Sequence, residues 1–129
     1  MATGTTHRVP RGYRPAIAFA ALVLCTSLIP VPESGSTAVP ALLGVSLDKW
    51  VHAGSYGLLT GLLAWGRRTR TVAAVALLVG VVVAYGAGVE FLQGLVASRT
   101  TSGADFLANA VGAVLVGVAW LAVGRSNDD

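Results

Sequence analysis

Four long apolar stretches fill most of this sequence, and their lengths limit what it can fold into. They cover residues 15–29, 50–66, 71–92 and 106–124. A helix needs about 20 apolar residues to cross the hydrocarbon core of a bilayer, with a range of about 17 to 25. The third and fourth stretches meet this requirement, and the second meets it if Asp48 and Lys49 lie at headgroup level. The first stretch is the shortest.

The composition is that of a membrane protein. Of the 129 residues, 54% are hydrophobic and 12% are charged, whereas a soluble domain usually carries about 25% charged residues. We predict an all-α fold, a four-helix transmembrane bundle over residues 15–124 with tails at 1–14 and 125–129. The membrane bilayer is its expected surrounding. Nucleic acid is not an expected partner, because no basic patch alternates with aromatic residues.

The arginines predict which side of the membrane each end faces. Lys and Arg in short loops mark the cytoplasmic side. Seven arginines precede the first stretch, fill the link between the second and third, or follow the fourth: Arg8, Arg11, Arg14, Arg67, Arg68, Arg70 and Arg125. The other two links hold only Lys49 and Arg99. Both termini are therefore predicted to be cytoplasmic, and these two links extracytoplasmic.

The first stretch admits a second interpretation. Three arginines followed by a short apolar core resemble a secretory signal, and Ser36-Thr37-Ala38 resembles a cleavage site. A gel shift between full-length and N-terminally sequenced protein separates the cleaved form from the retained span.

Small residues within the stretches predict close helix packing. Pairs spaced four apart let membrane helices approach each other, and three such pairs occur: Gly57 with Gly61, Gly80 with Ala84, and Ala108 with Gly112. The one cysteine, Cys25, has no disulfide partner. We expect it to be a small, buried apolar filler.

Polar side chains enter the stretches where these begin or end toward the predicted outer side. Residues three or four apart share a helix face, so each helix presents its polar pair to one boundary. Ionisable groups at the edge of membrane helices are costly and usually functional. We predict one outward-facing substrate site, formed by Asp48, Lys49, His52, Glu90, Gln93, Arg99, Asp105 and Asn109.

Helix capping explains part of this set. Asp48 follows Ser46, a possible N-cap, and Asp105 lies three residues after Ser102, as in a capping box. Glu90 has no such explanation, because the dipole disfavours a carboxylate near a helix C-terminus. It must be protonated, paired or hydrated, and Arg99 is the expected partner. A purely structural network of these charges remains an alternative.

Three chemistries are open to these residues. A histidine with carboxylates is a zinc pattern, but the set has one histidine at loose spacing, so we predict neither metal nor cofactor. His52, Glu90 and Asp48 are candidates for general acid and base catalysis. Lys49 and Arg99 are suited to bind a phosphate or carboxylate. No nucleophile motif is evident, so whether the protein is an enzyme stays open.

In this order the polar residues resemble the VanZ-like family. Its pattern of Asp-Lys-x-x-His, Glu-x-x-Gln, Arg, Asp and Asn-x-x-Gly reads here as Asp48-Lys49-Trp50-Val51-His52, Glu90-Phe91-Leu92-Gln93, Arg99, Asp105 and Asn109 with Gly112. The match covers roughly residues 17 to 123. Family members often have an aromatic residue after the histidine, where this chain has Ala53.

The resemblance implies a multi-pass bacterial membrane protein of the cell envelope that retains its first span. The family is named after a teicoplanin-resistance protein, which implies a link to glycopeptide resistance. It implies no defined activity. We expect binding of a lipid-linked or cell-wall intermediate, or of a glycopeptide-related envelope component. The alternatives are an enzyme acting on envelope lipid phosphates and a structural or partner-binding bundle.

Overall fold

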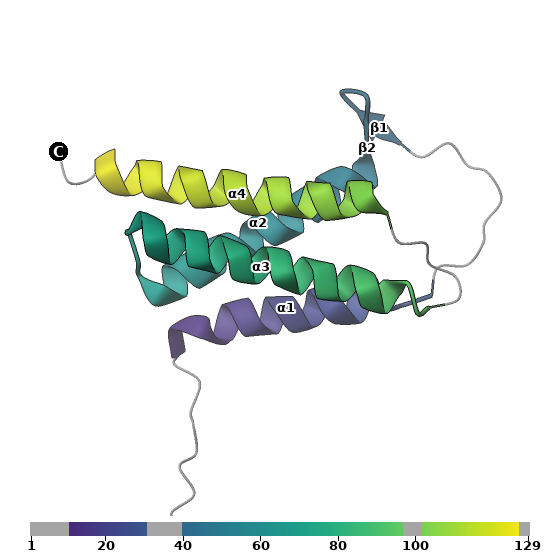
Figure 1. Ribbon diagram of the computed structural model, residues 1–129, viewed down its shortest axis with the longest axis horizontal. Coiled ribbons are helices and arrows are strands. Elements are labelled where there is room, and N and C mark those ends of the chain that lie inside the picture. Colours follow the sequence, from purple (N-terminus) through teal and green to yellow (C-terminus); the bar gives the residue numbers. More distant parts are fainter. Residues whose placement is uncertain (1–10, 31–39, 97–101, 127–129) are drawn as a thin grey trace, which may run out of the picture.

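A computed structural model describes residues 11–30, 40–96 and 102–126, and these residues form a helical protein (Figure 1). The helices are α1 (Arg14–Ser27), α2 (Leu47–Arg67), α3 (Val72–Gln93) and α4 (Gly103–Ser126). A short 3-10 helix, η1 (Arg11–Tyr13), precedes α1. The prediction of a helical fold with four helices is confirmed. A small hairpin of β1 (Ala41–Leu42) and β2 (Val45–Ser46) precedes α2 and was not predicted.

Successive helices run in opposite directions (Figure 1). The C-terminal ends of α1 and α3 lie together with the N-terminal ends of α2 and α4, beside the hairpin; we call this the polar end. The opposite, arginine end holds the α2–α3 link and the C-terminal end of α4. α2 packs most closely on α4, and α3 and α1 complete the bundle. The predicted polar residues of the described helices therefore gather at one end.

Glycines allow α2 and α4 to approach closely. A Cβ atom at Gly112 would overlap the carbonyl oxygen of Ala53, and one at Gly57 would lie 2.8 Å from Cγ2 of Val116. The predicted packing role of these two glycines is confirmed. The role of Gly80 is not: a Cβ atom there would meet nothing within 4 Å, because this face of α3 is exposed.

The arginine end is held by contacts of the α2–α3 link. Trp120 of α4 donates a hydrogen bond from Nε1 to the carbonyl oxygen of Thr69 at 2.8 Å. The guanidinium of Arg70 lies 4.9 Å from the centre of the Trp120 ring, which is a cation–π distance. Thr71 caps α3 by accepting from the backbone N–H of Ala74 at 3.4 Å. The two contacts of Trp120 therefore tie the α2–α3 link to α4, and the Thr71 cap fixes the start of α3.

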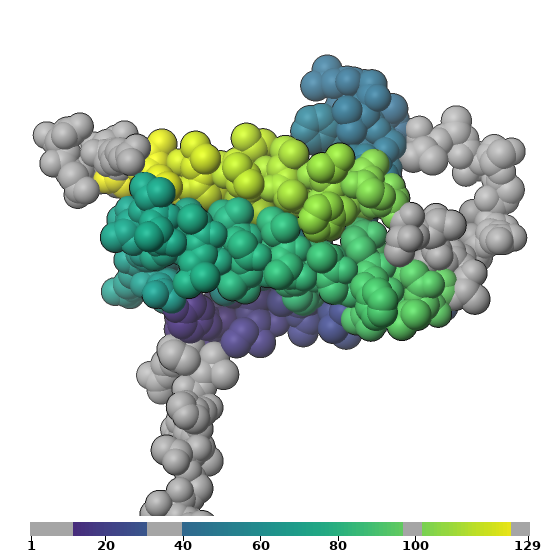
Figure 2. All heavy atoms as spheres, in the orientation of Figure 1, coloured from purple at the N-terminus to yellow at the C-terminus, as the bar shows by residue number. Residues whose placement is uncertain are grey.

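Two helices, α3 and α4, are long and apolar enough to cross a membrane by length and composition. Only 28% and 22% of their apolar windows are buried inside the protein, so most of this apolar surface faces outward, and the two helices lie side by side in Figure 2. Large outward apolar surfaces mark contact with lipid or protein. The structure therefore gives weak support to membrane association.

Cys25 departs from the prediction. It is a free cysteine on the exposed face of α1, not a buried filler. The inner positions of this helix belong to other residues: Ala16 is buried, and Phe19, Ala20 and Val23 pack against the core. The proposed cleavage site at 36–38 lies outside the described residues.

Candidate functional site

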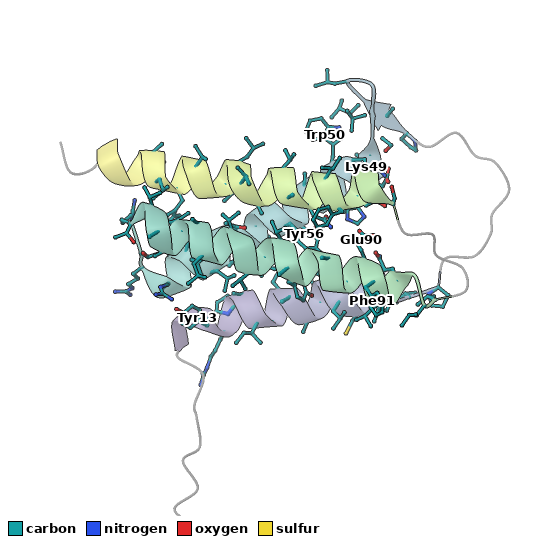
Figure 3. The ribbon with its side chains drawn as sticks, viewed as in Figure 1. Tyr13, Lys49, Trp50, Tyr56, Glu90 and Phe91 are labelled. Carbon is teal, nitrogen blue, oxygen red and sulfur yellow. The ribbon has the colours of Figure 1, made fainter. Side chains whose placement is uncertain are left out.

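Lys49 joins α2 to α4 at the polar end. Its Nζ donates to Oδ2 of Asp48 at 2.8 Å and also to Oδ1 of Asp105. The two carboxylates come from the first turns of different helices. Figure 3 shows Lys49 beside the start of α4. We call Asp48, Lys49 and Asp105 the ion cluster.

Lys49 holds both carboxylates of the ion cluster, and the predicted N-cap of α2 is not formed by the Ser46 side chain. Ser46 occupies the N-cap position of α2, but its side chain makes no capping hydrogen bond. Lys49, with a smaller contribution from Ser46, lowers the pKa of Asp48 from 3.8 to about 2. Asp105 and then Asp48 raise the pKa of Lys49. The charge of Lys49 is thus already balanced by two carboxylates.

We expect the ion cluster to weaken in acid. A carboxyl whose pKa is lowered on folding contributes stability above its unfolded value and loses it as the pH falls through its folded value. The contribution of Asp48 is therefore present above about pH 4 and disappears toward pH 2, while the raised pKa of Lys49 preserves its charge up to at least its ordinary value of 10.5. Because Asp48 is exposed, the loss should stay below about 1 kcal/mol.

Hydrogen exchange in the first turns of α2 and α4, compared at pH 6 and pH 3, measures this loss. After division by the intrinsic exchange rate at each pH, the protection of these amides should be lower at pH 3 than at pH 6 in the wild type. In Lys49→Gln the protection should already be low at pH 6 and should change less with pH. An equal acid response in both proteins would show that other groups cause it.

His52 is oriented by Asn109. Its Nδ1 lies 2.9 Å from Oδ1 of Asn109, which is 1% exposed. An amide oxygen only accepts, so this contact places the proton on Nδ1 and leaves Nε2 of a neutral ring as an acceptor. The sequence placed both residues in the site but did not pair them.

Glu90 faces the interior of the polar end. It is 8% exposed, whereas its neighbour Phe91 is 68% exposed and points away from the bundle (Figure 3). Lys49, His52 and Asp105 all act electrostatically on its carboxyl group. Its expected partner, Arg99, lies outside the described residues.

Among residues 11–30, 40–96 and 102–126, two buried polar atoms at this end have no hydrogen-bond partner. They are Oε1 of Glu90, an acceptor when ionised, and Nδ2 of Asn109, a donor. Such a group costs about 1–3 kcal/mol when left unsatisfied, and buried polar groups usually have a partner. An unsatisfied acceptor and donor beside His52 are suited to meet a small polar group supplied from outside the protein.

A cavity of about 160 Å³ lies next to these residues, between α1, α2 and α3. Its lining consists of Val23, Thr26, Ser27, Val51, His52, Ser55, Tyr56 and Gln93. It extends from buried Tyr56 and Gln93 to exposed Thr26 and Val51, so it reaches the surface. Nε2 of Gln93 donates to the carbonyl oxygen of Ser27 at 3.2 Å and ties α3 to α1.

Two tyrosines and a glycine pack beside the cavity. The rings of Tyr56 and Tyr85 lie 6.1 Å apart, and the hydroxyl of Tyr85 donates to the carbonyl oxygen of Ala20 at 2.5 Å. A Cβ atom at Gly86 would lie 2.9 Å from Tyr56 and 3.5 Å from Nδ2 of Asn109. The missing side chain at Gly86 lets both residues pack against α3.

The structure thus divides the predicted site into two neighbouring parts. Asp48, Lys49 and Asp105 form the ion cluster. His52 and Gln93 line the cavity, with Asn109 and Glu90 beside His52. Sequence reasoning missed the contribution of α1, although Thr26 and Ser27 end its apolar stretch and give a weak signal. Across 11–30, 40–96 and 102–126, His, Cys, Asp and Glu form no group of three or more arranged to hold a metal ion.

Comparisons of the chain with family models, with curated proteins and with solved structures give no match.

Proposed function

We propose that this chain is a VanZ-like integral membrane protein of the bacterial cell envelope, with four spans and an outward-facing polar end. The separation of the arginines from the polar residues supports this orientation, because cytoplasmic loops are enriched in Lys and Arg. Contacts from Tyr85 and Gln93 to the backbone of α1 support a first span that is retained and packed. The resemblance of the polar residues to the VanZ-like pattern is the basis for including a link to teicoplanin resistance in this proposal.

The polar end binds a lipid-linked or cell-wall intermediate in this proposal. The observation that supports it is that Oε1 of Glu90 and Nδ2 of Asn109 are buried without a partner among the described residues, beside His52, which lines a cavity that reaches the surface. Lys49 is already paired with two carboxylates. The described residues therefore favour recognition of hydroxyl or amine groups over recognition of phosphate.

A sensitivity assay tests this function. In a host where the wild-type protein changes the susceptibility to teicoplanin or bacitracin, Glu90→Gln should reduce that change and Arg99→Ala should lose it at normal membrane levels. Arg68→Ala, in the exposed link at the arginine end, is the matched control and should retain it. Full activity of both polar-end variants would contradict the proposed site.

A second candidate is an enzyme that acts on envelope lipid phosphates. The contact between His52 and Asn109 favours it, because the fixed ring directs a free nitrogen away from Asn109 and His52 lines the cavity. Purified protein with undecaprenyl phosphate should then release phosphate with a pH optimum that follows a histidine, and Asn109→Leu should slow the release by about 10²-fold or more. Folded protein without turnover would exclude this reaction.

A further inference from the structure

The β1–β2 hairpin exposes large apolar side chains on one face and at its tip. Leu42, Val45 and Leu47 are exposed, and Leu43 at the tip is 85% exposed. Residues 40–47 contain no charged side chain. Figure 1 shows the hairpin standing out from the side of the bundle beside the start of α4. A projecting apolar element of this kind is unfavourable in water.

The turn uses a leucine where the backbone favours other residues. Leu43 has φ of 54° and Gly44 has φ of 75°. Left-handed conformations at both central positions favour Asn-Gly or Asp-Gly, and a bulky residue there is strained. Leu43 gains no packing within the protein in return, since it is almost fully exposed. A strained, exposed leucine at a tip indicates that the side chain is used outside the chain.

The hairpin is fixed to the start of α2. Nε1 of Trp50 donates to the carbonyl oxygen of Leu42 at 3.2 Å, and the backbone N–H of Leu47 donates to the carbonyl oxygen of Pro40 at 2.8 Å. The strands pair Ala41 with Ser46 and Leu42 with Val45. Figure 3 shows Trp50 at the base of the hairpin. The tip is therefore held at a set position relative to His52, which follows two residues after Trp50.

We propose that the hairpin is an interfacial anchor that inserts Leu42, Leu43 and Val45 into the outer leaflet. Leu42 and Val45 are a cross-strand pair on one face, and Leu43 lies at the tip, so a lipid phase that surrounds the hairpin covers all three side chains. The two short strands leave their outer edges unpaired, so the insertion is confined to the interface, where headgroups and water still reach the backbone. Trp50 at the base suits the interface, and the charged Asp48 and Lys49 lie next to it. The anchor sets the depth of the cavity below the headgroups, and it rests on the proposed membrane orientation.

Lipid-phase quenching tests the anchor in the full chain. In a Cys25→Ala background, Leu43→Cys is labelled with nitrobenzoxadiazole and reconstituted in phosphatidylethanolamine–phosphatidylglycerol vesicles. Emission should be blue-shifted and quenched more by doxyl lipids than by iodide. Arg68→Cys in the same background should show the reverse. Labelled Cys25 of the wild type is the lipid-facing reference, because it is exposed on α1.

Each outcome separates the anchor from the membrane assignment. If the Leu43 probe behaves like the Arg68 probe while the Cys25 probe is quenched by lipid, the anchor is wrong and the membrane assignment stands. If doxyl lipids quench neither the Leu43 probe nor the Cys25 probe, the anchor and the membrane assignment are both wrong. Shielding of the Leu43 probe from both quenchers would indicate a protein partner and overturn the anchor.

A second variant tests the role of the Leu43 side chain without distorting the turn. Leu43→Asn suits the left-handed backbone, so the unfolding temperature should not fall. A nitrobenzoxadiazole probe at Val45→Cys should nevertheless lose most of its quenching by doxyl lipids in the Leu43→Asn protein. Unchanged quenching of that probe would show that Leu43 does not hold the hairpin in the leaflet.

Discussion

Replacing Glu90 with leucine should leave the bundle stable and remove ligand binding at the polar end. Glu90 is 8% exposed, and its Oε1 has no hydrogen-bond partner among the residues that the structure describes. Leucine removes this unsatisfied oxygen together with the hydrogen bond between the carboxyl group and the backbone of Ser102. Replacing a buried polar group by an apolar one of similar shape can be nearly neutral. A ligand that bonds to the carboxylate would lose about 1.5–3 kcal/mol, roughly ten- to a hundredfold in affinity.

Thermal unfolding in detergent, measured beside ligand binding, tests this pattern. Glu90→Gln is the matched control, because it keeps the shape and one acceptor and should retain part of the affinity. A large loss of stability in Glu90→Leu with unchanged binding would favour the structural network. A double-mutant cycle with Arg99→Ala would then show a coupling well above the roughly 0.6 kcal/mol average for membrane hydrogen bonds.

Of the glycines whose surroundings the structure describes, Gly112 should cause the largest loss of stability when it is replaced with alanine. Its Cβ would meet the carbonyl oxygen of Ala53, so backbone opposes backbone and no side chain is available to move. Overpacking of this kind costs about 1–3 kcal/mol or more. It would also separate α2 from α4, and with them Lys49 from Asp105.

Gly80→Ala is the matched control for this prediction. The added methyl meets nothing within 4 Å, and alanine favours a helix by about 0.8–1.0 kcal/mol over glycine. Denaturant unfolding followed by circular dichroism should therefore show a weaker Gly112→Ala protein and a Gly80→Ala protein at least as stable as the wild type. Equal stability of the two variants would mean that α2 and α4 are not in the close contact described.

The helices were predictable because apolar runs of this length have few alternatives, but their ends were not. The third stretch, 71–92, corresponds closely to α3, Val72–Gln93. By contrast, α2 begins at Leu47 and α4 at Gly103, three residues before their predicted apolar starts. Hydrophobicity marks the segment suited to hydrocarbon, whereas polar first turns such as those holding Asp48 and Asp105 extend the helix beyond it.

The alternating directions of the helices made it possible to predict that the polar residues lie at one end. They did not predict which of these residues contact each other. Lys49 meets Asp105, and His52 meets Asn109, because the close approach at Gly112 sets the register of α2 against α4. The spacing of residues in the sequence predicts which side chains share a face of one helix. It does not predict the register of one helix against another. For the same reason the cavity wall from α1 was missed. The expected contact of Glu90 with Arg99 stays a prediction.

A ligand-binding cavity at the polar end is tested most directly by native mass spectrometry of the protein extracted from bacterial envelopes. The wild type and Gly80→Ala should retain one bound envelope molecule whose headgroup carries hydroxyl or amine groups. Glu90→Leu and Gln93→Leu, extracted in the same way, should lose it while remaining folded. A wild-type spectrum without any bound molecule, or the same bound molecule in all four proteins, would contradict the proposed site.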